Sequence, residues 1–119
     1  MTLEVRNIDK EADVRTFEHG KAEVAKAGSV VVGRATLEPG WRWSTSVKPI
    51  ARTDSCQVHH KGFVISGRIH VVMDDGAEGE AGPGDVYEIS AGHDAWVVGD
   101  ESYVAVDFSE EIAGYAKPR

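Results

Sequence analysis

The glycines of this chain divide it into short, valine-rich stretches, and this spacing of the glycines constrains the fold more than any other feature. Thirteen glycines are spread over 119 residues, which indicates many tight turns between short elements. The stretches between the glycines are rich in β-branched residues, as is typical of strands. The sequence therefore predicts an all-β sandwich or barrel, formed as one domain over residues 1–119 with a barrel core at about residues 28–108.

Individual strands are expected where apolar residues alternate or run together between turn signals. Two such signals are Glu38-Pro39-Gly40 and the hairpin sequence Asp74-Asp75-Gly76. Helical periodicity is weak except over residues 110–115, with at most one helical turn near residues 9–17. The expected strands are residues 30–37, 56–66, 68–73, 86–89, 95–98 and 103–108.

Charge and cysteine content limit the partners and the compartment that we expect. The formal net charge of -7, with scattered basic residues, predicts that neither nucleic acid nor an anionic membrane is a partner. No stretch approaches the roughly 20 apolar residues of a membrane span, and residues 1–10 lack the apolar core of a signal peptide. Cys56 is the single cysteine, so an internal disulfide is impossible and a cytoplasmic location is expected.

The order of turns and strands in the second half of the chain resembles the cupin superfamily. Gly84 is followed by five residues and then by Ser90-Ala91-Gly92, which matches the spacing of that family's second motif. Ala95 and Gly99 occupy the places of the motif's metal-binding histidine and its asparagine, but His93 lies two residues before Ala95. The resemblance implies a double-stranded β-helix, or jelly-roll barrel, whose lumen holds a divalent metal or a small ligand.

The family's first motif can be placed by counting back from Gly67. This count puts His60 at the position of the motif's glutamate, and Asp54 and Cys56 at the positions of its two histidines. Gly40 best matches the motif's opening glycine, and about eight extra residues, around positions 46–53, then lie within the motif; we expect them to form a loop at the open end of the barrel. The turns therefore match the family's motifs closely, whereas the positions of the family's metal ligands carry other residues.

The residues at these positions still suggest a metal site. Asp54, Cys56 and His60 share strand parity, so their side chains would project toward one side. With His93 they offer two imidazoles, a thiolate and a carboxylate, which suit zinc, iron(II), nickel or copper. Only one of His59 and His60 can face inward on a regular strand, and the motif count favours His60, although a bulge would reverse the choice. The predicted metal residues are His60 and His93, helped by Cys56 or His59.

Each candidate ligand also has an ordinary structural interpretation. A single cysteine in a strand is commonly a small buried hydrophobic residue. His93 lies in a Gly-His-Asp turn, where it would be exposed or paired with Asp94. Asp54 lies between Thr53 and Ser55 in a polar segment, which favours a turn role.

The three tryptophans are candidates for a ligand pocket. Trp41 and Trp43 would stand on one face of a strand after the turn at residues 38–40, and Trp96 follows the second motif. Together with Asp54 they would wall a pocket for an apolar or aromatic small molecule. They would equally fill the core of the barrel or form part of a dimer interface. The resemblance to small cupins implies a homodimer.

Two functions from different classes follow from these observations. The first is a metal-dependent enzyme acting on a small molecule, such as an oxygenase, isomerase or cyclase. The second is a ligand-binding or sensory domain that is not catalytic and holds no metal. No arrangement of residues typical of a hydrolase is evident. Cys56 is too close to His59 and His60 along one expected strand for these residues to be assigned as a nucleophile and its base. No phosphate-binding glycine loop is present.

Overall fold

The computed structural model describes residues 2–117, and short strands dominate this range. The strands are β1 (Asp13–Phe17), β2 (Gly20–Ala27), β3 (Val30–Leu37), β4 (His60–Ser66), β5 (Ile69–Met73), β6 (Glu78–Ala81), β7 (Val86–Ile89), β8 (His93–Val97) and β9 (Tyr103–Asp107). The helices are α1 (Ile8–Glu11), α2 (Trp43–Ser46), α3 (Lys48–Ala51) and the 3-10 helix η1 (Glu110–Gly114). Among residues 2–117, no helix is long and apolar enough to cross a bilayer. The all-β prediction is confirmed.

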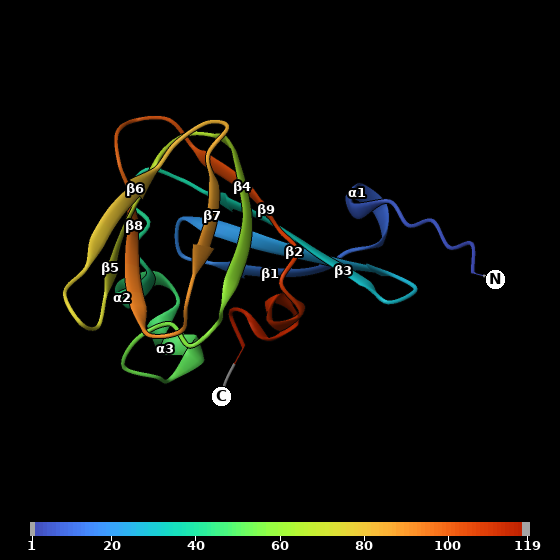
Figure 1. Ribbon diagram of the computed structural model, residues 1–119, viewed down its shortest axis with the longest axis horizontal. Helices are drawn as coiled ribbons and strands as arrows, with labels where there is room; N and C mark the ends of the chain where they lie inside the picture. The colour runs from blue at the N-terminus through green and yellow to red at the C-terminus, as the bar shows by residue number, and fades with distance from the viewer. Residues whose placement is uncertain (1, 118–119) are drawn as a thin grey trace.

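The strands form two antiparallel sheets that close around one interior. The larger sheet has the strand order β1-β2-β3-β9-β4-β7, and the smaller sheet has the order β6-β5-β8. Figure 1 shows the smaller sheet facing the larger one, while β1, β2 and β3 continue past the barrel on the far side. This arrangement is the expected double-stranded β-helix, because sequence-distant strands such as β3 and β9 pair within one sheet.

Strand alternation decides which side chains enter the barrel. Along β8 and β9 buried residues alternate with half-buried ones, and each strand begins and ends on a buried residue. Successive side chains point to opposite faces of a sheet, so His93, Ala95 and Val97 face inward from β8. From β9 the inward residues are Tyr103, Ala105 and Asp107. The first residue of β8 and the last of β9 therefore bring ionisable groups into the interior.

The sequence did not indicate the first two strands, which make the larger sheet begin well before residue 28. Residues 20–27 read Gly-Lys-Ala-Glu-Val-Ala-Lys-Ala, and alanine, lysine and glutamate favour helix over strand. They form β2 because they pair along their whole length with β3, from Gly20 opposite Leu37 to Ala27 opposite Val30. Pairing and burial outweigh the local preference here.

The segment before β4 also differs from expectation. The strand predicted for residues 56–66 begins only at His60, and Cys56 makes an isolated bridge to His93 instead. Residues 43–51, expected as strand and then loop, form α2 and α3. Proline in the first turn of α3 suits a helix start. The two helices lie beside one end of the barrel in Figure 1.

The C-terminal 3-10 helix covers another part of the barrel. Ile112 of η1 packs so closely on Gly33 that a Cβ atom at residue 33 would lie 2.4 Å from Ile112 Cγ1. Arg15 Nη1 donates hydrogen bonds to the carbonyl oxygens of Tyr115 (2.8 Å) and Ile112 (3.4 Å). These contacts fix η1 against β1 and β3, and they place Tyr115 at the wall of the interior.

Candidate metal and ligand site

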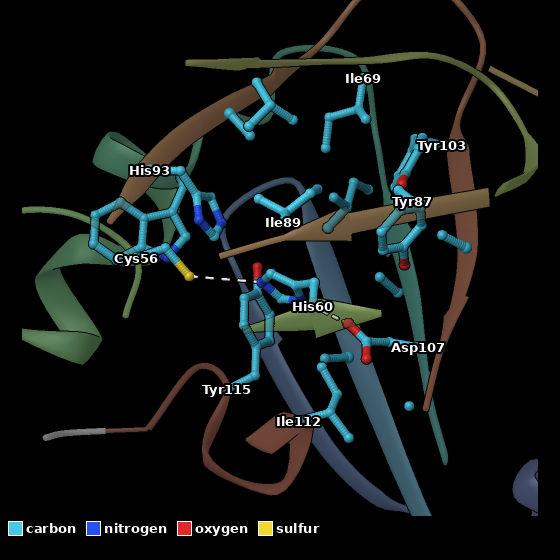
Figure 2. A pocket seen from close by; sticks show the side chains of 18 of the residues that line it. Cys56, His60, Ile69, Tyr87, Ile89, His93, Tyr103, Asp107, Ile112 and Tyr115 are labelled. Carbon is cyan, nitrogen blue, oxygen red and sulfur yellow. Dashed lines mark hydrogen bonds and ion pairs between the residues drawn. The ribbon is translucent and has the colours of Figure 1, made fainter. Parts of the chain in front are cut away.

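The interior of the barrel contains a cavity of about 60 Å³, which is room for a few water-sized groups. Its walls come from β2, β3, β4, β5, β7, β8 and β9, together with two tryptophans and the η1 segment. Most of the lining side chains are apolar, as Figure 2 shows for Ile69, Ile89 and Ile112. Polar side chains also line the cavity, and those on one side, Cys56, His60 and His93, form the candidate site.

Cys56, His60 and His93 meet at this side of the cavity. Each offers one potential ligand atom, and these three atoms lie within 4.8 Å of one another. Cys56 Sγ is 3.7 Å from His60 Nε2, and the centroids of the two imidazole rings are 5.3 Å apart. Figure 2 shows the thiol and both rings facing the same space.

The backbone brings these residues together from separate segments. His60 is the first residue of β4, and His93 is the first residue of β8. Cys56 N donates a hydrogen bond to His93 O over 2.8 Å, so the segment before β4 is tied to the start of β8. The site therefore depends on the contact between the two sheets.

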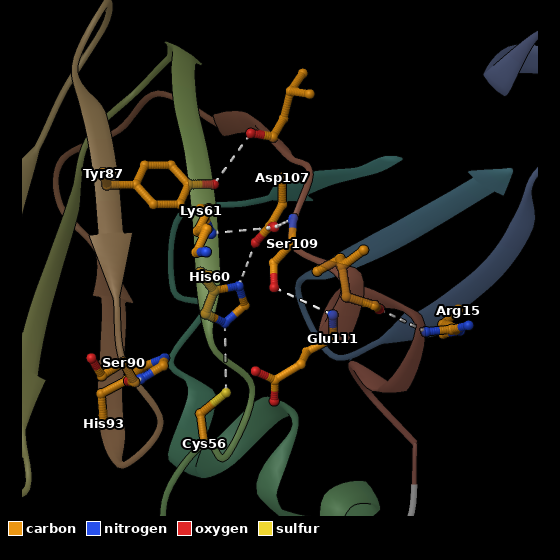
Figure 3. A network of polar contacts seen from close by, with 12 residues as sticks. Arg15, Cys56, His60, Lys61, Tyr87, Ser90, His93, Asp107, Ser109 and Glu111 are labelled. Carbon is orange, nitrogen blue, oxygen red and sulfur yellow. Dashed lines mark hydrogen bonds and ion pairs between the residues drawn. The ribbon is translucent and has the colours of Figure 1, made fainter. Parts of the chain in front are cut away.

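Asp107 orients the ring of His60. His60 Nδ1 lies 2.6 Å from Asp107 Oδ2, and because the carboxylate accepts, Nδ1 carries the proton. The other oxygen of Asp107 accepts from the backbone N–H of Ser109 (2.9 Å) and, over 3.4 Å, of Lys61. Figure 3 shows this chain of contacts from Ser109 through Asp107 and His60 to Cys56. The arrangement leaves His60 Nε2 as the nitrogen that faces the cluster.

His93 is oriented by the backbone rather than by a carboxylate. Its Nδ1 lies 2.8 Å from the carbonyl oxygen of Ser90, which can only accept, so Nδ1 is the protonated nitrogen. The side chain is buried. His93 Nε2 is consequently free to offer its lone pair, and in both histidines Nδ1 makes the kind of hydrogen bond that commonly orients a metal-binding imidazole.

Cys56 and His60 shift each other's pKa. Burial raises the pKa of the Cys56 thiol, but its hydrogen bonds with His60 and His93 outweigh burial and lower the pKa to about 6. Burial lowers the pKa of His60, but its hydrogen bonds to Asp107 and Cys56 outweigh burial and raise the pKa to about 9. At neutral pH the pair is thus a thiolate and an imidazolium, the charge state from which a metal ion displaces a proton.

The donor set fits a borderline transition metal. Nitrogen and sulfur ligands on one tetrahedral zinc ion lie about 3.6 Å apart, close to the 3.7 Å between His60 Nε2 and Cys56 Sγ. Two imidazoles and a thiolate suit zinc, iron(II), nickel or copper better than magnesium or calcium.

Three of the polar groups also form a chain of thiol, imidazole and carboxylate. Cys56, His60 and Asp107 follow one another at contact distance, which is the order of groups found around a nucleophilic cysteine and its base.

Two residues predicted for the site lie elsewhere. His59 Nε2 is 2.9 Å from Glu88 Oε2 in an exposed pair, so this side chain points away from the cluster. Asp54 is exposed in a bend and does not line the cavity. The parity argument failed for Asp54 because residues 54–59 do not form the regular strand on which it relied.

The tryptophans divide between the interior and the surface. Trp41 and Trp43 are buried and line the cavity, although neither lies on the strand that the sequence suggested. Trp96 points outward from β8 and is not a pocket residue. Its ring stacks on His70 with centroids 4.7 Å apart, and the guanidinium of Arg42 lies 4.1 Å from its centroid.

Asp107 is the functional residue that the sequence analysis missed. The expected strand at residues 103–108 alternates, and its large apolar residues Val104, Val106 and Phe108 lie on the face that proves to be the outer one. Asp107 shares parity with Tyr103 and Ala105, which line the cavity. Reading both faces of that strand would have identified an inward carboxylate.

The sequence matches no family model and no curated protein, but the structure resembles several solved ones. A protein of unknown function from Vibrio parahaemolyticus has a TM-score of 0.59 at 10% identity, with 82% of this chain and 97% of that chain covered. A cupin-2 domain from Rhodospirillum rubrum has a TM-score of 0.58 at 15% identity, with 93% and 77% covered.

A third similar structure belongs to a larger enzyme. An oxalate decarboxylase from Bacillus subtilis, described with Mn(II) centres, has a TM-score of 0.56 at 22% identity, with 87% of this chain covered. The chain spans only 29% of the length of that enzyme. At these identities the similarities establish the fold, and any function has to be argued from the site.

Proposed function

Since the chain has the cupin fold, we propose that it is a small metal-binding cupin in which Cys56, His60 and His93 hold a divalent transition metal. The adjoining cavity would hold a small molecule. The observation that carries the proposal is the convergence of two oriented imidazoles and a thiol whose ligand atoms lie within 4.8 Å of one another. The oxalate decarboxylase described with Mn(II) centres supports metal binding by this fold, while the sulfur ligand here favours zinc, iron(II), nickel or copper.

The second imidazole favours a metal over a nucleophilic cysteine. A nucleophile of the cysteine–histidine type needs one imidazole as base and one group to orient it, and His60 with Asp107 would supply both. That chemistry needs only one imidazole base, whereas His93 is a second oriented imidazole, buried at the same point with its Nδ1 bound to Ser90. Ligation of one ion accounts for all three side chains.

The protein groups around the site have separable roles in this proposal. Asp107 and the Ser90 carbonyl hold protons on the Nδ1 atoms, so that both Nε2 atoms remain available. The apolar walls restrict water. A divalent ion with three protein ligands keeps a position for water or substrate and supplies Lewis-acid or redox chemistry. The enzyme-like candidates are therefore an oxygenase, an isomerase or a cyclase.

A second candidate is a ligand-binding or sensory cupin without catalysis. The observation in its favour is the cavity wall away from the cluster, which is largely apolar and carries the hydroxyls of Tyr87, Tyr103 and Tyr115. Burial raises the pKa of all three tyrosines, so their hydroxyls do not readily give up a proton to a substrate. In this case the hydrogen-bonded Cys56–His60–Asp107 chain would be a structural feature of the barrel.

Metal analysis of matched variants tests the proposal. Protein purified without chelators should carry stoichiometric metal, or take up zinc, iron(II) or nickel on titration. Cys56→Ser, His60→Ala and His93→Ala should each lose it, whereas His59→Ala should retain it, because His59 faces away from the cluster. Circular dichroism would establish that the variants fold. Wild-type protein that binds none of these metals would overturn the proposal and leave the second candidate.

A further inference from the structure

The hydroxyl of Tyr115 lies on the cavity side of the Cys56, His60 and His93 cluster. The ring of Tyr115 lines the cavity, and its centroid is 5.6 Å from that of the His60 imidazole. Figure 2 shows this ring rising from the η1 segment with its oxygen directed toward the space between Cys56 and His60. Burial raises the pKa of Tyr115 well above its ordinary value, and the charge of the nearby Cys56 raises it further. The hydroxyl therefore keeps its proton and can donate a hydrogen bond toward the cluster.

The other two tyrosines line a different part of the cavity. Figure 2 shows Tyr87 and Tyr103 beside each other, on the side of the cavity away from Cys56. Burial raises the pKa of both, and the acidic group of the site that adds to this effect is Asp107, not Cys56. Tyr115 is therefore the tyrosine that is placed to contact a ligand bound at the cluster.

Contacts of its backbone and its ring hold Tyr115 in this position. Its carbonyl oxygen accepts a hydrogen bond from Arg15 Nη1 over 2.8 Å, and its backbone N–H donates to Ile112 O over 3.1 Å. The ring also packs edge-on against Phe17, with centroids 6.2 Å apart. A hydroxyl that is fixed before a ligand arrives loses little conformational entropy when it forms a hydrogen bond to that ligand.

We propose that Tyr115 is a ligand-binding residue of the metal site, and that its hydroxyl donates a hydrogen bond to a small anion that coordinates the ion. A divalent ion held by one thiolate and two neutral imidazoles keeps one positive charge and an open position, which an anion fills. Hydroxide and azide have a further lone pair at the coordinating atom and accept the hydrogen bond. Imidazole has none there and gains nothing from the hydroxyl. This inference rests on the proposed metal site, and it names the class of ligand that the site prefers.

Cobalt(II) protein tests the inference, because cobalt(II) takes nitrogen and sulfur ligands as zinc does and absorbs visible light. Metal-free protein is loaded with cobalt(II), uptake is measured by elemental analysis after gel filtration, and azide or imidazole is then titrated. Tyr115→Phe removes only the hydroxyl, and the matched control Tyr103→Phe removes a hydroxyl elsewhere in the same cavity. We expect equal cobalt uptake in the three proteins. Azide should bind Tyr115→Phe about 10–100-fold more weakly than wild type, whereas Tyr103→Phe and all imidazole affinities should change little.

A second measurement needs no variant at position 115. Zinc protein with ¹³Cζ-labelled tyrosine should give one phenol resonance for each of the three tyrosines. The resonances of Tyr87 and Tyr103 are identified by their absence in Tyr87→Phe and Tyr103→Phe, which leaves that of Tyr115. Azide should shift the Tyr115 resonance saturably and leave the other two nearly unmoved.

Several results would overturn the inference. They are absence of azide binding to the cobalt protein, equal azide affinity in Tyr115→Phe, an equal loss in Tyr103→Phe, and a Tyr115 resonance that azide does not move. Loss of cobalt from folded Tyr115→Phe would also overturn it, because the phenol would then be a ligand of the ion itself. Wild-type protein that takes up no metal would overturn the proposed function together with this inference, whereas metal uptake with any of the former results would contradict only the inference.

Discussion

His60 Nδ1 donates a hydrogen bond to Asp107 Oδ2 over 2.6 Å, although the two residues are 47 positions apart in the chain. The bond joins the first residue of β4 to the last residue of β9 in the same sheet. Backbone amides on both sides hold the other carboxylate oxygen, so Asp107 is itself fixed. The orientation of His60, and with it the geometry of the whole cluster, depends on this contact.

Replacing Asp107 with asparagine should weaken metal binding without removing a ligand. An asparagine has one accepting oxygen and one donating NH2 group. Either the NH2 group faces His60 Nδ1–H, or it faces the backbone N–H groups that Asp107 now binds. His60 would then lose the firm Nδ1–H contact that leaves Nε2 for a metal. We expect zinc affinity to fall about 10–100-fold, measured by competition with a chromophoric chelator. Asp100→Asn, at an exposed turn, is the control. Unchanged affinity in Asp107→Asn would show that the contact does not orient a ligand.

The lowered pKa of Cys56 predicts a thiolate in the metal-free folded protein. Its ultraviolet absorbance should rise as the pH increases through about 6, whereas urea-unfolded protein should show the rise near the ordinary value of 9.0. Because the folded-state pKa is the lower one, ionisation of Cys56 stabilises the folded protein fully above the unfolded value. This contribution is lost as the pH falls through about 6.

Two variants check the origin of this titration. Cys56→Ser should remove the absorbance change altogether. His60→Gln should move its midpoint upward, because it removes one of the two hydrogen bonds and the positive charge that favour the thiolate. A midpoint near 9 in the folded wild-type protein would contradict the prediction.

Gly33 should not tolerate a side chain. Its backbone is not strained, but a Cβ atom would meet Ile112 Cγ1 at 2.4 Å and displace η1. Gly33→Ala should therefore lower the free energy of unfolding by about 1–3 kcal/mol, measured by urea denaturation. Gly79→Ala on β6 is the matched control, because nothing lies within 4 Å of its added Cβ. Ile112→Ala should recover part of the loss in a double variant, and purely additive effects would argue against the contact.

The homodimer implied by the sequence resemblance has a candidate surface on the larger sheet. Phe63 and Val86 lie opposite each other on β4 and β7, and with Ile65 they expose apolar side chains. If this face joins two copies, wild-type protein should be a dimer in light scattering, and Phe63→Glu with Ile65→Glu should make it monomeric with unchanged circular dichroism. Val30→Glu, at an exposed position on β3, should stay dimeric. A monomeric wild-type protein would rule the dimer out.

Turn chemistry made much of the barrel predictable. The strands expected at residues 30–37 and 86–89 have those bounds in the structure, and those at 68–73 and 103–108 differ by one residue at one end. Glycine and proline act over a few residues, so their effect can be read locally. The strand β2 could not be found this way, because its alanines, lysines and glutamate do not favour a strand until β3 pairs with them.

The candidate site was predictable only in part. The motif count alone selected His60 over His59 as the inward histidine, and the structure places it so. The sequence could not show that Cys56 lies off the strand and bridges to His93, since that contact joins segments from both sheets. It also gave Trp96 the same weight as Trp41, because a pattern of residue types does not reveal which face of β8 points outward.

By itself, the sequence determined the fold class, the main turns and which residue types were available as ligands, because those follow from local backbone preferences and short-range spacing. Only the tertiary structure decided that Cys56, His60, His93 and Asp107 share one point, and that the Tyr115 ring lies beside them. Those relationships depend on strand register and on closure of one sheet over the other, which bring distant segments within bonding distance. No local pattern specifies such distances.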